Sequence, residues 1–350
     1  MSVRILSSAD VRKITSSFST QDLLAQSATI FSLLSSKDEG HASDAEIISS
    51  PHRTSVQTVN HNVLFMPSRV RHIGTAIKVV SVPVTDKARS GGLPASTMVL
   101  DEETGAVKAL VNARSLTAIR TAGGSLLSTV FLLSDSQPTT LTAFGAGAQI
   151  YAHVSLHMRQ FGSIQRANIV NRTSNARLES LMAALKSEFP HAQVSALTGN
   201  SGAVQEAVKS AHIIVTATSS TVPLFDADCV QPGAHIILVG SYKPNMHEVS
   251  TSVIRRAGRI VVDSRSACLQ EAGELIEARI PGQDLVELGE LVDAPEGKAK
   301  QELVQEVRKT GDVTIFKSVG VGVQDVMITS AVVKRAEELN IGTVVHGYDD

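Results

Sequence analysis

The sequence predicts an α/β protein in which a doubly wound parallel sheet follows a segment built around an antiparallel sheet. From residue 139 onward, short apolar runs alternate with helical patterns, which is typical of strands joined by helical crossovers. Before residue 135, period-two segments follow one another with turns between them, and this favours antiparallel pairing. The chain has 350 residues, a length that suits two domains and a substantial core.

The composition excludes several classes of protein. Hydrophobic residues make up 43% of the chain, too many for a disordered protein. The formal net charge is −2 and aromatic residues make up 3%, which argues against nucleic-acid binding by phosphate neutralisation or base stacking. The sequence shows neither a membrane-span pattern nor a signal-peptide pattern. Two cysteines, Cys229 and Cys268, cannot form a disulfide framework. We therefore expect a cytoplasmic protein with no nucleic-acid or membrane partner.

The first part of the chain is expected to hold a helix, four strands and a second helix. The first helical pattern begins at Thr20. Period-two strands are expected at residues 54–59, 73–82, 96–101 and 106–111. The last two strands are joined by a turn that ends in Gly105, because glycine accepts a positive φ. Ser115 is placed to cap the second helix, which runs to about residue 132.

The second part is expected to hold six parallel strands with helices between most of them. The strands are expected at residues 139–144, 167–171, 193–197, 213–216, 236–239 and 259–263. Alternation of this kind predicts a doubly wound sheet. The tail at 323–339 is again helical, with an apolar stripe.

A glycine-rich turn lies between the first of these parallel strands and its helix. Residues 145–150 read GAGAQI. Gly145 would make the tight turn, and Gly147 would let the backbone approach a pyrophosphate at the helix N-terminus, beside Ala148 and Gln149. Ile150 stands where the dinucleotide fingerprint has its third glycine. The turn predicts a dinucleotide site on a Rossmann-type domain, and an ordinary βα turn is the alternative.

The end of the next strand bears on the choice of nucleotide. It reads Asn171-Arg172-Thr173. NAD sites usually carry a carboxylate here for the ribose 2′-hydroxyl, whereas an arginine accommodates a 2′-phosphate. Arg172 offers a planar fork of donors, and its two neighbours offer neutral hydrogen bonds. The pattern favours NADP(H) over NAD(H), unless Arg172 is only a solvated residue at a helix start.

Three basic residues of the first part stand in weakly charged surroundings. Arg53 precedes a strand, Lys78 lies inside the apolar alternation IGTAIKVVSV, and Arg120 falls in the first turns of a helix. A lysine inside a β-core run needs a partner or a ligand, and arginines can grip a carboxylate bidentately. If they converge, the three would form an anion pocket. Taken singly, each is also compatible with a surface position.

Other groups able to do chemistry are sparse. The eleven histidines show no metal-ligand spacing, so no metal is expected. We interpret His153 and His157, four residues apart on the helix after the glycine turn, as a surface or packing pair. Glu271 and Glu274 are interpreted as a structural cap or an interdomain contact.

Together these motifs resemble the ornithine cyclodeaminase/μ-crystallin family over nearly the whole chain. Several ordered blocks are much more specific than any single motif. The blocks are Arg53, the Lys78 strand, residues 92–97, 116–122, 145–147, 171–173, 216–218 and 239–241, Pro244 with Glu248, and residues 271–275, 316–320 and 324–325.

The resemblance implies a homodimer whose N-terminal domains pair through their sheets. Residues 1–135 and 321–350 would form the substrate-binding and dimerisation domain, residues 136–320 the Rossmann domain, and the active site would lie in the cleft between them. The matched positions imply that Arg53, Lys78 and Arg120 bind the substrate carboxylate and neighbouring groups. The positions implied to line the cofactor are Ser96, Thr97, Arg120, Thr216, Thr218, Val239 and Ser318.

Three departures from the family's cyclodeaminases distinguish the chain. Those enzymes carry an aspartate two residues after the glycine that matches Gly240 and another before the serine that matches Ser318. Here the two positions are Tyr242 and Lys317, and Arg172 replaces the carboxylate of the nucleotide strand. The differences favour the branch of NADPH-dependent ketimine reductases.

We therefore expect reduction of a C=N bond beside a carboxylate, in a cyclic ketimine or an imino acid, with Lys78 as the proton donor. Two alternatives stay open. One is NAD-dependent cyclodeamination of ornithine or lysine. The other is a nicotinamide-nucleotide-binding structural or storage protein of the μ-crystallin type.

Overall fold

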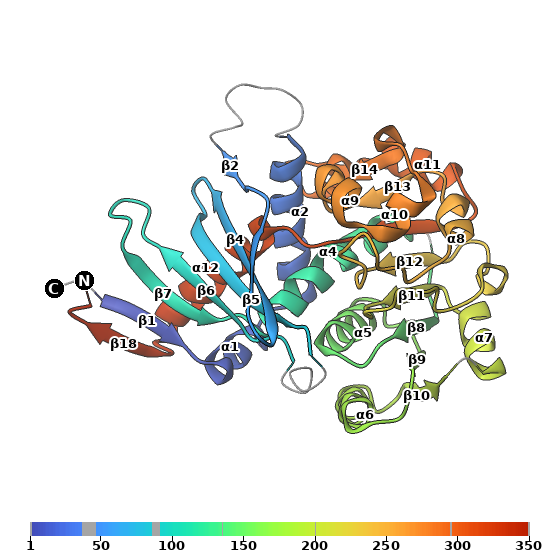
Figure 1. Ribbon diagram of the computed structural model, residues 1–350, viewed down its shortest axis with the longest axis horizontal. Coiled ribbons are helices and arrows are strands. Elements are labelled where there is room, and N and C mark those ends of the chain that lie inside the picture. Colours follow the sequence, from blue (N-terminus) through green and yellow to red (C-terminus); the bar gives the residue numbers. More distant parts are fainter. Residues whose placement is uncertain are drawn as a thin grey trace. The chain divides into compact units, whose positions relative to one another are not determined.

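The computed structural model describes residues 2–36, 47–85, 92–134, 136–199, 201–294 and 296–348. The chain forms two compact units, of which unit 1 comprises Met1–Arg120 and Gly320–Asp350, and unit 2 comprises Thr121–Val319 (Figure 1). The first boundary falls inside helix α4 (Leu116–Leu132), whereas the predicted boundary at residue 135 follows that helix.

Unit 1 is built on an eight-stranded sheet with the order β18-β1-β7-β6-β5-β4-β2, and β3 pairs with β4. Its strands are β1 (Ser2–Leu6), β2 (Ile48–Ser49), β3 (Thr54–Gln57), β4 (His61–Val70), β5 (Gly74–Pro83), β6 (Ala95–Leu100), β7 (Val107–Asn112) and β18 (Thr343–His346). Its complete helices are α1 (Ser8–Thr15), α2 (Thr20–Ser36) and α12 (Gly322–Glu338). All neighbouring strands are antiparallel except β1 and β7, which are parallel.

One face of this sheet is buried and the other is open. Along β4, β5 and β6 buried residues alternate with partly exposed ones, as the period-two pattern predicts. Helix α12 contacts β4 to β7 and lies behind the sheet in Figure 1. Its approach to β4 is close, because a Cβ on Gly322 would overlap Ser68 Oγ.

Strands β1, β4 and β18 were not predicted. Pro67, Ser68 and Arg69 interrupt the apolar alternation of β4, and a proline argues against a paired strand when only the sequence is read. The structure nevertheless pairs Pro67 with Ile77 of β5 in an unbroken register. The helix predicted from Thr20 is present as α2, and the strand β1 and helix α1 precede it.

Unit 2 is a fully parallel sheet with the order β10-β9-β8-β11-β12-β17-β13-β14. These strands are β8 (Thr140–Phe144), β9 (Arg166–Asn171), β10 (Gln193–Thr198), β11 (Ile213–Thr216), β12 (His235–Leu238), β13 (Ile260–Val262), β14 (Leu285–Glu287) and β17 (Thr314–Lys317). A small pair comprises β15 (Val292–Asp293) and β16 (Lys298–Ala299). The helices that follow α4 are α5 (Ala148–Gln160), α6 (Ala176–Glu188), α7 (Gly202–Lys209), α8 (Thr251–Arg256), α9 (Arg265–Glu271), α10 (Gly273–Ala278) and α11 (Gln301–Lys309).

All six strands expected here are present, and the predicted α/β class with a doubly wound parallel sheet is confirmed. The prediction missed β14 and β17. Strand β17 has only four residues and ends in Lys317, yet all four are buried because it lies between β12 and β13. The order reverses at β8, between β9 and β11, and ligands of such sheets bind beyond the carboxyl ends of the strands at this point.

Of the two interpretations of His153 and His157, a surface pair or a packing pair, the structure supports the packing pair. Both are 0% exposed, as is His235 of β12. Their Nε2 atoms lie 2.9 Å from Ser125 Oγ and Thr129 Oγ1 of α4, respectively. The periodicity indicated a packing helix but could not show that hydroxyls of α4 would cover both rings.

Within the described residues, no helix is long and apolar enough to cross a membrane.

Candidate active site

The glycine turn after β8 has the backbone that its sequence predicts. Gly145 has a φ of +122°, a region that favours glycine. A Cβ there would also lie 3.0 Å from the carbonyl oxygen of Ala217 and 3.2 Å from Ile150 Cγ1. Ile150 is fully buried, so the residue in the third-glycine position packs under the turn and keeps its side chain away from the loop's open side.

Gly147 lies at the N-terminus of α5 and faces open space. It is the N-cap residue and supplies no side-chain cap, so the first backbone N–H groups of the helix remain available to an anion. A Cβ on Gly147 would meet nothing within 4 Å among the described atoms. Ala148 is exposed and Gln149 is half-buried. This turn fits a dinucleotide pyrophosphate, because the protein itself does not need a glycine at 147.

The residues after β9 are open to solvent. Asn171 turns back and donates from Nδ2 to the carbonyl oxygen of Thr173 at 2.8 Å. Arg172 and Thr173 are exposed, and Arg172 forms no hydrogen bond or ion pair with the described residues. Its guanidinium is therefore available to an external anion such as a phosphate.

A buried carboxylate, Glu248, ties together the ends of β11 and β12. It is 0% exposed and accepts four hydrogen bonds. The donors are Thr216 Oγ1 (2.7 Å), Thr218 N (2.6 Å), Thr218 Oγ1 (2.8 Å) and Gly240 N (2.7 Å). Burial raises the pKa of Glu248, and the nearby Lys317 charge and these donors oppose the rise.

This arrangement changes the meaning of two predicted cofactor residues. The hydroxyls of Thr216 and Thr218 both donate to Glu248, so they stabilise the loop ends and have no proton left to donate to a ligand. Gly240 is required here, because a Cβ would overlap Thr218 and Glu248. Val239, just before it, is half-buried.

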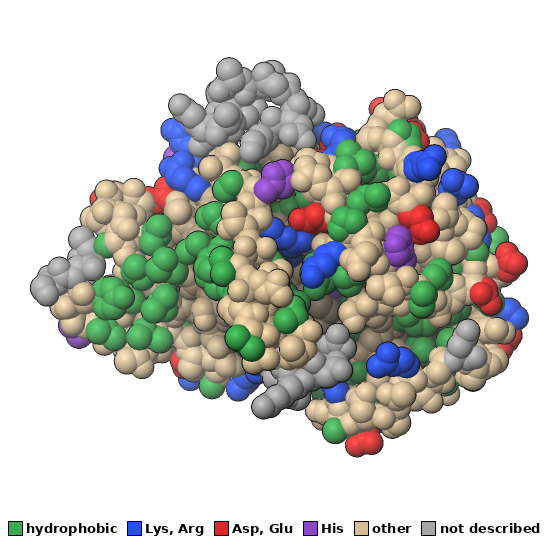
Figure 2. All heavy atoms as spheres, in the orientation of Figure 1, with side chains coloured by type: hydrophobic (Ala, Val, Ile, Leu, Met, Phe, Trp, Pro, Cys, Tyr) green, Lys and Arg blue, Asp and Glu red, His purple; other side chains and the backbone are tan. Residues whose placement is uncertain are grey.

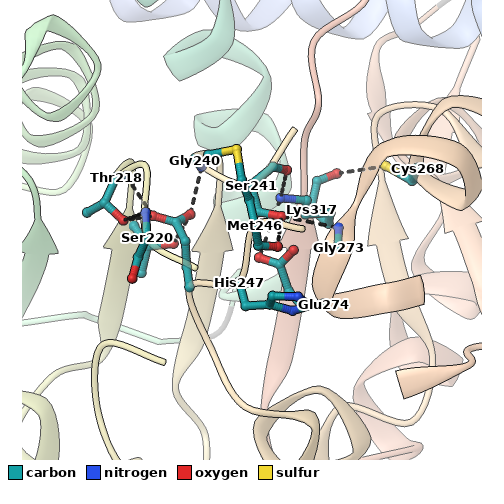
Figure 3. Close-up of polar contacts among 12 residues, drawn as sticks. Thr218, Ser220, Gly240, Ser241, Met246, His247, Cys268, Gly273, Glu274 and Lys317 are labelled. Carbon is teal, nitrogen blue, oxygen red and sulfur yellow. Dashed lines mark hydrogen bonds and ion pairs between the residues drawn. The ribbon is translucent and has the colours of Figure 1, made fainter. Parts of the chain in front are cut away.

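A second buried network surrounds Lys317 at the end of β17. Lys317 is 0% exposed, and its Nζ donates to the carbonyl oxygen of Ser241 at 2.5 Å. Glu274 Oε1 lies 3.6 Å from Nζ. Figure 3 shows these residues together with the backbone of Gly273, whose N–H donates to Ser241 Oγ. Glu274 is thus the counter-ion of Lys317, inside unit 2.

Ser318, the next residue, is hydrogen-bonded to a third buried carboxylate, Asp263. Its hydroxyl donates to Asp263 Oδ2 at 2.7 Å, and Cys268 Sγ lies 3.4 Å from the other carboxylate oxygen. Burial, with the Asp263 charge, raises the pKa of Cys268 well above its ordinary value, which makes this thiol a poor nucleophile. Ser318 is 2% exposed.

In unit 1 the predicted cations come together around one aspartate. Lys78 on β5 and Arg120 on α4 are 2% and 6% exposed. Lys78 Nζ lies 2.7 Å from Asp325 Oδ2, and Arg120 Nε donates to Asp325 Oδ1 at 3.1 Å. Burial lowers the pKa of Lys78 to about 8, with the charges of Arg120 and Arg53 acting in the same direction and Asp325 opposing them. Arg53 is therefore close enough for its charge to affect Lys78.

Ser96 and Thr97 are neighbours on β6 that face opposite sides of the sheet. Thr97 is paired with Lys78 in the register and is 0% exposed, while Ser96 is exposed. Thr97 Oγ1 finds no hydrogen-bond partner among the described residues. Only Thr97 shares the sheet face of Lys78, because side chains alternate along a strand.

Sequence reasoning missed the roles of Asp325 and Glu248. Both belong to blocks that carried the family resemblance, but neither stands near its partners in the sequence. The available signal was chemical: Lys78 in a β-core run required a counter-charge. Within the described residues, no group of three or more His, Cys, Asp and Glu is placed to hold a metal ion.

Comparison with known proteins agrees with this architecture. A family model described as the ornithine cyclodeaminase/mu-crystallin family matches residues 15–340. Delta(1)-pyrroline-2-carboxylate reductase of Bacillus cereus is 30% identical, over 85% of this chain and 89% of the relative. Ketimine reductase mu-crystallin of Rattus norvegicus is 32% identical, over 68% of each chain. The solved Delta(1)-pyrroline-2-carboxylate reductase of Thermococcus litoralis, in complex with NADH and L-proline, superposes with a TM-score of 0.80 at 23% identity, over 97% of this chain and 99% of that one.

The sheet order, the glycine turn and these similarities define a Rossmann-type oxidoreductase. The chain belongs to the ornithine cyclodeaminase/mu-crystallin family. The family and the general enzyme class predicted from the sequence, an oxidoreductase, are both confirmed.

Proposed function

We propose that the protein reduces a C=N bond adjacent to a carboxylate, in a cyclic ketimine or imino acid, with NADPH as the reductant. The observation that carries this proposal is the buried trio of Lys78, Arg120 and Asp325. The charge of Arg53 also acts on Lys78. These cations suit a substrate carboxylate, and Lys78 holds a proton that can be transferred.

A reduced nicotinamide nucleotide, held by the glycine turn at Gly145 and Gly147 and by Arg172, would supply a hydride for the imine carbon. Arg53 and Arg120 bind the substrate carboxylate, which fixes that carbon in position. As the carbon accepts the hydride, the C=N π pair moves to nitrogen, and nitrogen takes a proton from Lys78 Nζ. A pKa near 8 suits this transfer, because the ammonium is populated at neutral pH yet gives up its proton readily. Solvent returns the proton to Lys78 after product leaves.

The decisive assay is a screen of NADPH oxidation with cyclic ketimines and with α-keto acids plus amines. NADH and ornithine are tested in parallel. Substrate-dependent oxidation of NADPH supports the proposal. Ammonia release from ornithine or lysine without net change in nicotinamide absorbance would instead identify a cyclodeaminase. Saturable nucleotide binding without turnover across the panel would identify a storage or structural protein.

Arg172→Ala is expected to weaken NADPH binding by about 10- to 100-fold, since a charge-assisted contact to phosphate contributes roughly 1.5–3 kcal/mol. NADH binding should change less than about threefold, because NADH has no 2′-phosphate. Titration of each nucleotide by fluorescence measures both constants. Arg166→Ala, an exposed arginine at the start of β9, is the control. Equal losses for the two nucleotides would refute the preference for NADP(H).

Gly147→Ala is expected to leave folding intact and to weaken both nucleotides. The added Cβ meets no described atom within 4 Å, so the midpoint of thermal unfolding should stay within about 2 °C. A bound pyrophosphate would meet the methyl group, and we expect an affinity loss of about tenfold or more. Gly202→Ala, also at a helix start and with nothing within 4 Å, is the matched control and should change neither quantity. Unchanged nucleotide affinity in Gly147→Ala would place the pyrophosphate elsewhere.

The homodimer implied by the resemblance is also part of the proposal. The face of the unit 1 sheet opposite α12 carries partly exposed apolar side chains, and Figure 2 shows hydrophobic side chains gathered over these strands. A continuous apolar face of this kind favours burial against a second copy. Its members include Val63, Phe65, Ile77, Val79, Met98, Leu100 and Leu110.

A further inference from the structure

Asp325 occupies a distinctive position in unit 1. It lies in the first turn of α12 and is 3% exposed. Its two carboxylate oxygens are divided between two cations: Oδ2 lies 2.7 Å from Lys78 Nζ, and Oδ1 accepts from Arg120 Nε at 3.1 Å. One anion from the end of the chain therefore holds two of the three proposed substrate cations, which come from its beginning.

Residues near Asp325 in the sequence also hold Arg120. Arg120 Nη1 donates to Gln324 Oε1 at 2.9 Å, and Gln324 Nε2 donates back to the carbonyl oxygen of Arg120 at 3.1 Å. A Cβ on Gly320 would lie 3.0 Å from Arg120 Nη1, so the guanidinium packs directly on the backbone that leads into α12. Side chains held by several contacts of this kind are pre-organised for binding.

The charged groups that act on Lys78 come from several segments of the chain, and Asp325 is the negative one among them. Arg120 of α4 and Arg53, ahead of β3, both lower the pKa of Lys78, and Asp325 is the group among the described residues that raises it. The cross-strand neighbours of Lys78 are Met66 on β4 and Thr97 on β6, and neither carries a charge. Without Asp325, burial and two cations would all favour the neutral amine.

We propose that Asp325 is a positioning residue of this reaction: it keeps Lys78 in its protonated, proton-donating form and orients Arg120 towards the substrate carboxylate. This inference rests on the proposed function. Asp325 forms no bond with substrate in this role. It acts through Lys78, so its removal should change the pH dependence of turnover rather than turnover alone.

The test is the pH profile of kcat in Asp325→Asn. Reduction needs protonated Lys78, so activity falls as pH rises through the pKa of that lysine, which is about 8 in the native chain. Loss of the aspartate charge should move this midpoint down by about one pH unit or more. We expect kcat to fall about fivefold or more at pH 8 but less than about threefold at pH 6. The KM for NADPH should stay within about twofold, because the glycine turn and Arg172 are not altered.

The matched control is Asp312→Asn, which also removes an aspartate paired with an arginine, Arg256, but at an exposed site in unit 2. Its midpoint should equal that of the native enzyme. A uniform loss at every pH in Asp325→Asn, with the midpoint unchanged, would overturn the inference and leave the proposed function standing. If the native enzyme turns over no imine, the proposed function is refuted. The pH dependence of the affinity for pyrrole-2-carboxylate, a planar ring carboxylate, is then measured in the native protein and in Asp325→Asn, and the same shift of its midpoint is expected.

A double variant covers the case in which Asp325→Asn does not fold. Lys78→Met with Asp325→Asn removes the buried pair together, and removing both partners costs less than stranding one charge. Recovery of the unfolding midpoint in the double variant supports the role of Asp325 as the counter-charge of Lys78. An unfolding midpoint that is lowered equally in the single and the double variant contradicts this role.

Discussion

Lys78→Met is expected to lower kcat by about 10²–10⁴-fold, the usual contribution of a positioned general acid. Methionine keeps an unbranched side chain of similar length in the β5 position but supplies no proton. The affinity for NADPH should remain within about twofold, because Lys78 lies in unit 1 and the glycine turn and Arg172 lie in unit 2. Steady-state kinetics and nucleotide titration measure the two quantities separately.

The control for this variant is Lys108→Met, which makes the same change at a half-exposed lysine of β7 that pairs with Glu337 on the surface. It should retain native turnover, because exposed ion pairs contribute at most about 1 kcal/mol to stability. Asp325 keeps its bond to Arg120 in Lys78→Met, so the variant retains a partner for the buried carboxylate. Native turnover in folded Lys78→Met would remove this lysine from the chemistry.

The sequence predicted the strand and helix around the glycine turn and singled out the cations, but it did not show which distant residues contact them. Lys78 stood out because a lysine in an alternating apolar strand is rare, and the glycine turn stood out because its spacing is set by a phosphate. The partner of Lys78 lies 247 positions later, on α12, and only the folded sheet brings Asp325 to it. Secondary-structure propensity and hydrophobic periodicity describe residues that are close in the sequence, whereas the contact between Lys78 and Asp325 depends on tertiary packing.

The same limit explains the residues around Glu248. Thr216 and Thr218 matched a family block, and a threonine at the end of a parallel strand is readily interpreted as a ligand for a cofactor. In the structure their hydroxyls satisfy Glu248, since a buried carboxylate requires several donors. The network indicates that Thr216 and Thr218 hold the loops at this edge of the sheet in place through Glu248 rather than contacting a ligand.

Three buried histidines in unit 2 make its stability sensitive to acid. His153 Nδ1 and His157 Nδ1 each face a carbonyl oxygen, of Gln149 and His153 respectively, at 2.7 Å. A carbonyl oxygen only accepts, so each ring carries a proton on Nδ1. Nε2 of His153 can then accept from the Ser125 hydroxyl, whereas the Thr129 hydroxyl beside His157 Nε2 also donates to the carbonyl oxygen of Ser125. His235 lies between Ser128 Oγ at 3.2 Å and Thr314 Oγ1 at 2.9 Å.

All three rings are therefore neutral in the folded protein. Burial lowers the pKa of His153 to about 4 and those of His157 and His235 to about 3. The groups that contact the rings are hydroxyls and carbonyls, which do not compensate an added charge as a carboxylate would. Protonation of these rings consequently requires that the packing between α4, α5 and β12 open.

Unit 2 is expected to lose about 4 kcal/mol of unfolding free energy between pH 7.5 and pH 5.5, if each unfolded histidine titrates near 6.5. Because the folded pKa values are depressed, the unfolded state binds more protons throughout this window, and stability falls as pH falls. Urea unfolding followed by circular dichroism at a series of pH values gives the slope. Glu248 has the opposite effect on the pH dependence of stability, because burial raises its pKa. The slope of unfolding free energy against pH is therefore compared between variants and the native protein.

His157→Gln removes one of the three titrating rings and should reduce the slope by about one third of the histidine contribution, whatever its effect on stability at neutral pH. Glutamine keeps an amide that can bond Thr129, so the fold has a means of tolerating the change. His191→Gln, at an exposed position after α6, is the matched control and should leave the slope unaltered. An identical slope in native protein and His157→Gln would mean that this ring does not gate acid unfolding, and that the acid sensitivity must be sought in other groups.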